Sequence, residues 1–420
     1  MTTKLVVIGQ GYVGLPLAVA AAEGGFHVVG YDIDERRVDK LAAGDSYVGD
    51  VAAERLRAIL DRGTYRPSID PDDLDGFDIA VITVPTPLHE GVPDLSYIES
   101  AGEALASRLR PGATVILEST SYPGTTEEVL APLLHKGSDL APGVDFHLGY
   151  SPERIDPGNA RWTFETTPKV VSGVDAASLE RVRAFYATIV EEVVVAPSPR
   201  VAELAKVLEN TFRHVNIALV NELATHAEHI GVDVWDALEI ASTKPFGFMR
   251  FTPGPGVGGH CLPVDPLYLS WKVERTHGKR FRLVELADEL NNQMPEYVVR
   301  RLTRGLDRRR QTVTGSRILM LGLAYKANTG DVRESPALPI ARMLIEAGAA
   351  VRVADPHVTE GPDIPGLTRV EPTPEELAAA HAVLITTDHD AFDYAAVAAH
   401  ARYVFDCRHR IPPAEHIESL

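Results

Sequence analysis

Residues 4–23 read KLVVIGQGYVGLPLAVAAAE, and this stretch decides the fold of the amino-terminal region. A short apolar strand ends at Ile8 and passes through a glycine-rich turn into an alanine-rich helix. Gly9 permits the tight turn, Gly11 lets the backbone approach a pyrophosphate at the helix N-terminus, and Gly14 allows the helix to pack closely on the strand. The pattern predicts a Rossmann-type dinucleotide-binding domain.

Asp32 completes this fingerprint, because it follows the second predicted strand 23 residues after Gly9 (32 − 9 = 23). A carboxylate there accepts a hydrogen bond from a free ribose 2′-OH and repels a 2′-phosphate, which favours NAD over NADP; Arg36 and Arg37 weaken this preference slightly. The alternative is a glycine turn without a ligand, and the segment 83–86 fits an ordinary strand-ending turn equally well. The predicted cofactor contacts are Gly9, Gly11, Tyr12, Val13, Gly14, Asp32, Arg37, Thr83, Pro85 and Thr86.

The composition is that of a globular protein with an acidic excess. The chain has 420 residues, 45% of them hydrophobic, and a formal net charge of −18. Such a length suggests two or three domains, and the net acidity argues against nucleic-acid binding and adhesion to anionic membranes. We expect a soluble cytoplasmic protein for three reasons. The chain has only two cysteines, it has no apolar run long enough to span a membrane, and the first predicted strand begins within a few residues of the N-terminus, which leaves no room for a signal peptide.

Apolar runs rich in Val and Ile alternate with helix-length segments, as is typical of a buried parallel sheet. The predicted strands are 5–8, 28–31, 79–84, 115–117, 169–174 and 192–196. Pro197 and Pro199 then mark a boundary. Residues 201–230 predict one helix of roughly 30 residues, about 45 Å long, and the segment 283–310, interrupted only by Pro295, is its expected partner.

After Gly315 the alternation of strands and helices resumes. The strands are 317–321, 351–354, 383–386 and 403–406, and the helices are 335–347, 375–380 and 391–400. We predict an α/β protein with two Rossmann-like doubly wound domains joined by a central helical domain with a long helix. The segment 322–326 has one glycine where the fingerprint needs three, so the second sheet is predicted to bind a different nucleotide.

Residues 254–266, GPGVGGHCLPVDP, are the most unusual segment, with four glycines and three prolines. We expect a backbone path that is neither helix nor strand, along which a substrate and a cofactor can approach the sulfur of Cys261. A lone cysteine is usually a small buried apolar residue, and Cys407 fits that description. The glycines and the nearby Asp265 favour a nucleophile at Cys261.

A thiol and NAD together indicate a narrow chemistry. NAD takes an alcohol to an aldehyde, a thiolate adds to the aldehyde, and the thiohemiacetal loses a second hydride to give a thioester, which hydrolyses to a carboxylate. The tetrahedral species need hydrogen-bond donors aimed at their oxygen. Lys206 and Asn210, four residues apart on the long predicted helix, share a face and can supply them, although a solvated helix face is the ordinary alternative.

Six separated motifs, in order along nearly the whole chain, together resemble the UDP-glucose and UDP-N-acetylhexosamine 6-dehydrogenase family. They are GQGYVGLPLA (9–18), EST (118–120), SPERIDPGN (151–159), the segment 203–210, the cysteine segment 254–266 and YKANTGDVRES (325–335). The resemblance implies NAD-dependent four-electron oxidation of the sugar C6 hydroxymethyl group to a uronate, without release of the aldehyde. It also implies an NAD-binding domain (1–197), a central helical dimerisation and catalytic domain (198–312) and a UDP-sugar-binding domain (313–420), hence a homodimer.

The resemblance assigns roles to individual residues and implies no metal. Cys261 matches the nucleophile, Glu153 and Asp265 match acid/base carboxylates, and Lys206 and Asn210 match groups that stabilise the oxyanion. Thr120 matches a hydroxyl near the reacting carbon and water and is also a predicted cofactor contact, and Arg333 matches a cofactor-site arginine. The implied substrate contacts are Glu153, Arg154, Lys206, Asn210, Gly258, Lys326 and, as a weaker match, Arg408.

The cysteine segment discriminates between substrates within this family. The UDP-glucose enzymes carry Lys between the Pro and the Asp, whereas this chain has Val264, which resembles the UDP-N-acetylglucosamine branch. Arg250 and Thr252 depart from the Pro and Tyr expected there. UDP-glucose or UDP-N-acetylmannosamine oxidation remains the alternative within the class; a two-electron hydroxyacid dehydrogenase and a catalytically silent nucleotide-sugar sensor are alternatives outside it.

Overall fold

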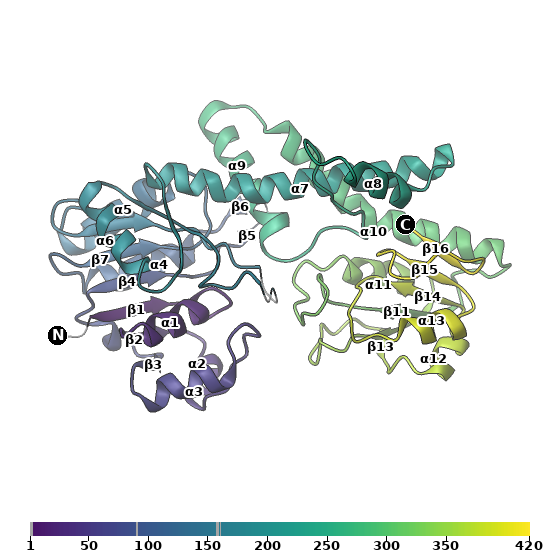
Figure 1. Cartoon of the computed structure of the whole chain (residues 1–420), viewed down its shortest axis with the longest axis horizontal. Helices are drawn as coiled ribbons and strands as arrows, with labels where there is room; N and C mark the ends of the chain where they lie inside the picture. The colour runs from purple at the N-terminus through teal and green to yellow at the C-terminus, as the bar shows by residue number, and fades with distance from the viewer. Residues whose placement is uncertain (1–2, 90, 157–158, 160) are drawn as a thin grey trace. The chain divides into compact units, whose positions relative to one another are not determined.

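The computed structural model describes residues 3–89, 91–156, 159 and 161–420. The chain forms two compact units, one comprising Met1–Glu209 with Trp271–Lys279 and the other Asn210–Ser270 with Arg280–Leu420. Each unit contains a largely parallel sheet with helices, and a long helix follows the first sheet, so the predicted fold class is confirmed (Figure 1). The three predicted domain ranges stay predictions. Among the described residues, no helix combines the length and apolar character that a membrane crossing requires.

The described residues of the first unit build an eight-stranded sheet in the order β10-β9-β8-β7-β4-β1-β2-β3 (Figure 1). Its strands are β1 (Lys4–Ile8), β2 (His27–Tyr31), β3 (Tyr65–Ser68), β4 (Ile79–Ile82), β7 (Thr114–Leu117), β8 (His147–Tyr150), β9 (Lys169–Gly173) and β10 (Val193–Val195). Neighbouring strands run parallel except at β8 and β9, which are antiparallel. A small separate hairpin joins β5 (Leu88–His89) to β6 (Val92–Pro93).

Helices cover both faces of this sheet. Side chains alternate along a strand, and accordingly Leu5 and Val7 of β1 belong to one apolar cluster while Val6 and Ile8 belong to another. The covering elements are α1 (Gly14–Glu23), α2 (Glu35–Ala42), α3 (Ala53–Asp61), α4 (Ser96–Ala106), the π-helical turn η2 (Thr126–Leu130), α5 (Ala131–Ser138) and α6 (Ala176–Tyr186), with the short 3-10 turn η1 (Pro71–Leu74). Burial on both faces explains why these strands read as continuous apolar runs.

The helices that follow are α7 (Pro199–Ile230), α8 (Val234–Ser242), α9 (Cys261–His277) and α10 (Arg282–Arg308). Helix α7 has 32 residues and begins at Pro199, because proline is tolerated in the first turn of a helix. The predicted partner is one continuous helix, α10, despite Pro295 in its interior. The prediction of a path without helix over residues 254–266 is wrong from Cys261 onward.

The described residues of the second unit build a six-stranded, all-parallel sheet in the order β13-β12-β11-β14-β15-β16 (Figure 1). Its strands are β11 (Arg317–Leu321), β12 (Ala350–Ala354), β13 (Thr368–Arg369), β14 (Ala382–Ile385), β15 (Val404–Asp406) and β16 (Ile417–Ser419), and its helices are α11 (Ala337–Glu346), α12 (Pro374–Ala379) and α13 (Tyr394–His400). Counted within this unit, the order is 3-2-1-4-5-6, which is that of a Rossmann sheet.

Candidate active site

The glycine turn after β1 is held in a shape that only glycine fits. Gly9 has φ = +93°, and a Cβ atom on Gly14 would lie 1.9 Å from the carbonyl oxygen of Gly9. The buried hydroxyl of Thr83, at the end of the neighbouring strand β4, lies within hydrogen-bond distance of the carbonyls of Ile8 (2.9 Å) and Gly9 (2.8 Å). Thr83 therefore braces the turn, a role that the sequence did not indicate.

The same turn leaves its backbone open at the position where a phosphate would approach. Apart from Gly11 and its two chain neighbours, no described atom lies within 4 Å of a Cβ built on Gly11, and within the described residues helix α1 begins without a side-chain cap. The N–H groups of a first helical turn need partners, and an anion can supply them. The residues of the turn thus fit the pyrophosphate of NAD.

Asp32 follows β2 at the same edge of the sheet and is almost fully buried. Its Oδ2 accepts a hydrogen bond from the N–H of Gln10 at 2.8 Å and lies 3.4 Å from Nη1 of Arg37. Arg36 instead pairs with Asp34. Of the other predicted cofactor contacts, Tyr12 and Pro85 are exposed, Val13 is half-buried and Thr86 is buried.

Thr120 and Glu153 lie at neighbouring strand ends. Strands β7 and β8 are parallel neighbours, and each residue follows its strand by three positions, after Leu117 and after Tyr150. Carboxyl ends of parallel strands share one edge of a sheet, where ligands bind in folds of this type. The structure thus places both residues on the edge that carries the glycine turn.

Glu153 pairs with Lys206 of α7 inside the first unit. The carboxylate Oε2 and the ammonium Nζ lie 3.4 Å apart, and both side chains are at most about a tenth exposed. Glu153 Oε1 also accepts a hydrogen bond from the backbone N–H of Ile155. Pro157 and Gly158 of the same motif lie outside the described residues.

Arg154 is engaged differently from its neighbour. Its guanidinium lies 2.8 Å from Glu209 Oε1 and donates a 2.8 Å hydrogen bond to the carbonyl of Pro168. Within the motif 203–210, Glu203 is also fully buried and accepts hydrogen bonds from the backbone N–H groups of Gly124 and Thr126. Both contacts fasten α7 to the loops around the predicted site, and the proposed substrate contact of Arg154 stays a prediction.

In the second unit, Cys261 is the first residue of α9 and Asp265 lies one turn further on. The amino end of a helix carries a partial positive charge, which stabilises an anion such as a thiolate. Pro263 falls in the first turn, where a missing N–H leaves no hydrogen bond unmade, and only Pro266 lies inside the helix. This is why the proline-rich segment is helical, contrary to the prediction.

Asn210 and Asp265 contact each other in the second unit. Nδ2 of Asn210 donates to Oδ2 of Asp265 at 2.5 Å, and both residues are buried. The predicted oxyanion donor and the predicted carboxylate are thus direct neighbours. Cys407, in contrast, is fully buried, and burial raises the pKa of its thiol far above the ordinary value, so it fits an inert core residue.

The glycines before Cys261 allow the loop to lie against the segment 325–336 of the second sheet. A Cβ atom on Gly258 would stand 2.6 Å from Cβ of Tyr325 and 2.7 Å from the carbonyl oxygen of Glu334, and the N–H of Gly259 donates to the carbonyl of Arg333 at 2.9 Å. In the second unit, the loop that leads to Cys261 therefore lies against the segment that carries Tyr325, Arg333 and Glu334, and the sites predicted for Gly258 and Arg333 adjoin. Arg408 lies beside the start of the same loop, because its Nη1 is 2.7 Å from the position of a Cβ on Gly254, and the site role of Lys326 stays a prediction.

A buried polar network that the sequence did not indicate supports the cysteine loop. Oδ1 of Asn221 accepts from the N–H of Gly254, and its Nδ2 donates to Oδ1 of Asn291, each at 2.9 Å. Asn291 in turn donates to the carbonyl of His214 at 3.3 Å. Burial lowers the pKa of His214 to about 4, which keeps this imidazole neutral at pH 7.

The second sheet differs from the first at the corresponding turn. Asp355, which follows β12 as Asp32 follows β2, accepts hydrogen bonds from the N–H groups of Leu323 (2.6 Å) and Ala324 (3.0 Å) and from His389 Nε2 (3.0 Å). Burial alone would raise the pKa of Asp355, but these hydrogen bonds hold it well below the ordinary value. Asp355 thus occupies two amides of its turn, whereas Asp32 accepts from one amide of its own turn, that of Gln10, and this difference agrees with the incomplete fingerprint.

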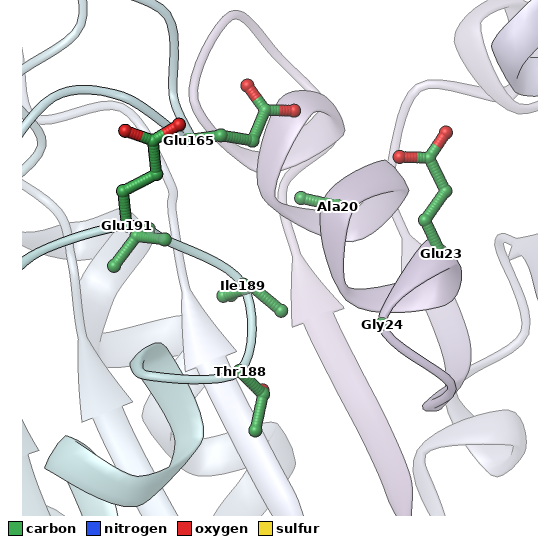
Figure 2. A pocket seen from close by; sticks show the side chains of 8 residues that line it. Ala20, Glu23, Gly24, Glu165, Thr188, Ile189 and Glu191 are labelled. Atoms are coloured by element: carbon green, nitrogen blue, oxygen red, sulfur yellow. The ribbon is translucent and has the colours of Figure 1, made fainter.

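Two hollows in the described part of the first unit, of about 260 and 310 Å³, are lined by none of the predicted site residues. Figure 2 shows the smaller one, with Glu165 and Glu191 on one side and Glu23 at the end of α1 on the other. Arg55 pairs with Glu23 at 2.7 Å and with Glu165 at 2.8 Å, so two of these carboxylates are already neutralised. Among the described residues there is no group of three or more side chains that could hold a metal ion.

The first unit has a Rossmann turn shaped for NAD, and the second unit has a thiol at the start of a helix with a buried carboxylate and amide; such features are typical of cofactor-dependent oxidoreductases. Comparison with known proteins makes the class more specific. The chain belongs to the UDP-glucose/GDP-mannose dehydrogenase family: the NAD binding domain of that family matches residues 3–190, the central domain 200–293 and the UDP binding domain 319–413. The predicted resemblance and NAD as cofactor are therefore confirmed.

Individual relatives are similar over most of their length. A UDP-N-acetyl-D-mannosamine dehydrogenase from Pyrococcus horikoshii is 37% identical over 93% of this chain and 90% of its own. A UDP-N-acetyl-D-glucosamine 6-dehydrogenase from Pseudomonas aeruginosa is 40% identical over 85% of this chain and 83% of its own. A solved structure of a UDP-D-ManNAc dehydrogenase from Pyrococcus horikoshii covers 99% of both chains with a TM-score of 0.89 and 34% identity. The protein is thus an NAD-dependent UDP-sugar dehydrogenase.

Proposed function

We propose that this enzyme oxidises the C6 hydroxymethyl group of a UDP-N-acetylhexosamine, and of UDP-N-acetylglucosamine in particular, to the carboxylate. The observation that carries the four-electron reaction is the grouping of Cys261 at the start of α9 with the contacting pair Asn210 and Asp265. Val264 supports the N-acetylated substrate, because a buried apolar side chain stands where the UDP-glucose enzymes carry a lysine. An acetamido methyl group is compatible with such a wall, whereas a lysine would add a cation.

In the first oxidation, the pair of Lys206 and Glu153 receives the proton of the C6 hydroxyl, with Thr120 positioning the oxygen. NAD, when bound, accepts the hydride in each of the two oxidations. The Cys261 thiolate then adds to the aldehyde carbon, and Asn210 and Lys206 donate hydrogen bonds to the resulting oxyanion. Lys326, Arg333 and Arg408 hold the anionic parts of the substrate and cofactor.

Loss of the second hydride from the thiohemiacetal gives a thioester on Cys261. Asp265 orients the water that hydrolyses it, releasing the carboxylate and restoring the thiol. Overall, the reaction consumes one alcohol, two NAD and one water, and it forms one carboxylate, two NADH and three protons. The sulfur holds the carbon in place between the two oxidations, so the aldehyde is not released.

UDP-N-acetylmannosamine is the second candidate substrate, and the similarity to the UDP-N-acetyl-D-mannosamine dehydrogenase from Pyrococcus horikoshii favours it. The two sugars differ only in the configuration at C2, which Val264 alone does not distinguish. A panel of UDP-N-acetylglucosamine, UDP-N-acetylmannosamine and UDP-glucose with NADH readout tests the choice. We expect the acetylglucosamine to exceed glucose in kcat/KM by roughly 10- to 200-fold. Equal or reversed efficiency contradicts the proposed substrate.

The reaction course is tested by titrating limiting UDP-sugar against NADH. Two NADH per sugar are expected, with a sugar adduct on the trapped wild-type protein by mass spectrometry. Cys261→Ala should lose the adduct and the uronate while retaining its fold and its affinity for NAD. One NADH per sugar, or unchanged uronate formation by Cys261→Ala, would move the protein to the two-electron class.

We also propose a homodimer through the helical region. Helix α7 carries exposed apolar side chains along its length, among them Leu208 (61% exposed) and Leu219 (60% exposed). Apolar surface of this extent is usually covered by a partner. Sedimentation should show a dimer at nanomolar concentration, and a stable active monomer would contradict the proposal. The cytoplasmic location stays a prediction.

A further inference from the structure

A buried charged cluster lies behind the sheet edge that carries Thr120 and Glu153. It consists of Glu118 at the end of β7, Lys169 at the start of β9 and Tyr186 at the end of α6, and each of these residues is at most 4% exposed. Lys169 Nζ donates to Glu118 Oε1, and the hydroxyl of Tyr186 donates to Glu118 Oε2 at 2.5 Å. Both carboxylate oxygens are therefore occupied by donors from other elements.

The lysine also contacts the chain at the predicted site. Lys169 Nζ donates to the carbonyl oxygen of Pro152 at 3.1 Å, and Pro152 directly precedes Glu153. Glu118 lies two residues before Thr120. One ammonium group thus joins the ends of β7 and β8 at the points where the two proposed site residues leave the sheet.

Stability alone is a weak reason for such a cluster. Removing a lysine and a glutamate from water is costly, and their attraction in the interior only partly offsets it. Apolar replacements of both partners at similar volume are often neutral or stabilising. A contact that apolar side chains cannot reproduce is the hydrogen bond from Lys169 to the Pro152 carbonyl.

We propose that Lys169 is a positioning residue for Glu153. Its ammonium fixes the orientation of the peptide between residues 152 and 153, and this sets the Glu153 carboxylate against the N–H of Ile155 and the ammonium of Lys206. Glu118 holds Lys169 in place, together with the aromatic ring of Tyr186, whose centroid lies 5.1 Å from Lys169 Nζ and which a phenylalanine would keep. The inference rests on the proposed role of Glu153 in the reaction.

A set of matched variants separates positioning from stability. Lys169→Met leaves Glu118 charged and buried without its cation, so both the Tm and kcat should fall, the Tm by roughly 5 °C or more. In the double variant Lys169→Met/Glu118→Gln no charge is left in the cluster, and the Tm should return to within about 3 °C of the wild type. Its kcat should stay roughly 10- to 100-fold low, because the Pro152 contact is still missing, while the KM for NAD is unchanged.

Tyr186→Phe is the control, since it removes a hydrogen bond to Glu118 and leaves the Pro152 contact in place. It should lower the Tm slightly and keep the wild-type kcat. Recovery of kcat together with the Tm in the double variant would show that Lys169 is only structural and would overturn the proposal. A loss of kcat in Tyr186→Phe comparable to that of the double variant would also overturn it.

Hydrogen exchange at the Ile155 amide gives a readout that does not depend on turnover. This N–H donates to Glu153, so its exchange should accelerate at least about tenfold in the double variant and stay unchanged in Tyr186→Phe. Unchanged exchange in the double variant overturns the positioning role. If instead the wild type turns over no UDP-sugar, the proposed function fails, and the exchange measurement still decides whether Lys169 positions Glu153.

Discussion

Asn221→Ala is the substitution for which the structure gives the clearest magnitude. The change leaves the Gly254 N–H without its acceptor and Asn291 Oδ1 without its donor, and both asparagines are at most 2% exposed. An unsatisfied buried polar group costs roughly 1–3 kcal/mol, so the loss of two partners should lower the free energy of unfolding by about 2–6 kcal/mol. For a unit of about 200 residues, at about 2–4 °C per kcal/mol, this corresponds to a Tm lower by roughly 4–24 °C.

Thermal unfolding followed by circular dichroism measures the shift, and kcat is measured on the same preparations. Asn216→Ala is the matched control on α7, because the hydrogen bond from the half-buried Asn216 amide to the carbonyl of Phe212 is exposed to solvent. It should stay within about 1 °C of the wild type. We also expect kcat to fall in Asn221→Ala, since Gly254 begins the loop that leads to Cys261. A melting temperature for Asn221→Ala within 1 °C of the wild type, or an equal loss in Asn216→Ala, would refute the reasoning.

Further predictions concern the cofactor turn, the buried histidine and the two thiols. Gly11→Ala should weaken NAD binding at least about tenfold without changing the Tm, because the added Cβ atom would meet the bound pyrophosphate and no atom of the surrounding protein. An unchanged Kd for NAD in a fluorescence titration would contradict the assignment of this turn to the pyrophosphate. Burial lowers the pKa of His214 to about 4, so as the pH falls the imidazole is protonated in the unfolded chain before it is protonated in the folded protein. The folded state therefore loses about 3 kcal/mol of its free energy of unfolding between about pH 6.5 and 4, a contribution that is fully present above pH 7. Urea unfolding at pH 7 and pH 4 should show a smaller difference for His214→Gln than for the wild type, and equal differences would exclude this role. A disulfide reagent should modify one thiol in each native chain, that of the half-buried Cys261. The buried thiol of Cys407 should react only after unfolding, and two rapidly reacting thiols in the native protein would contradict its burial.

Local patterns predicted the first part of the fold well, because a Rossmann turn depends on residues close in sequence. Gly9, Gly14 and Asp32 lie where the spacing placed them, and Thr83 braces the turn from the neighbouring strand. Strand β8 (His147–Tyr150) was missed, since HLGY lacks the Val and Ile run of its neighbours. The two-residue strand β13 is too short to give any periodic signal.

The cysteine segment shows a different source of error. Glycine and proline disfavour a helix over 254–266, yet α9 begins at Cys261 because a first turn needs few backbone donors. The supporting contacts had no signal in the sequence at all. Asn221 meets Asn291 across 70 residues and Glu118 meets Lys169 across 51, and only the packing of distant elements brings such partners together.

The Asp355 carboxylate helps to explain how two sheets with Rossmann topology in one chain can bind different nucleotides. It is tethered beside the amides of Leu323 and Ala324, so its local concentration far exceeds that of any dissolved phosphate. Asp32 accepts from one amide of its turn, that of Gln10, whereas at the Ala324 amide an incoming pyrophosphate would have to displace an internal competitor that is always present. In the second sheet the chain itself thus acts as the resident anion, and the same strand order can serve another nucleotide without competing for NAD.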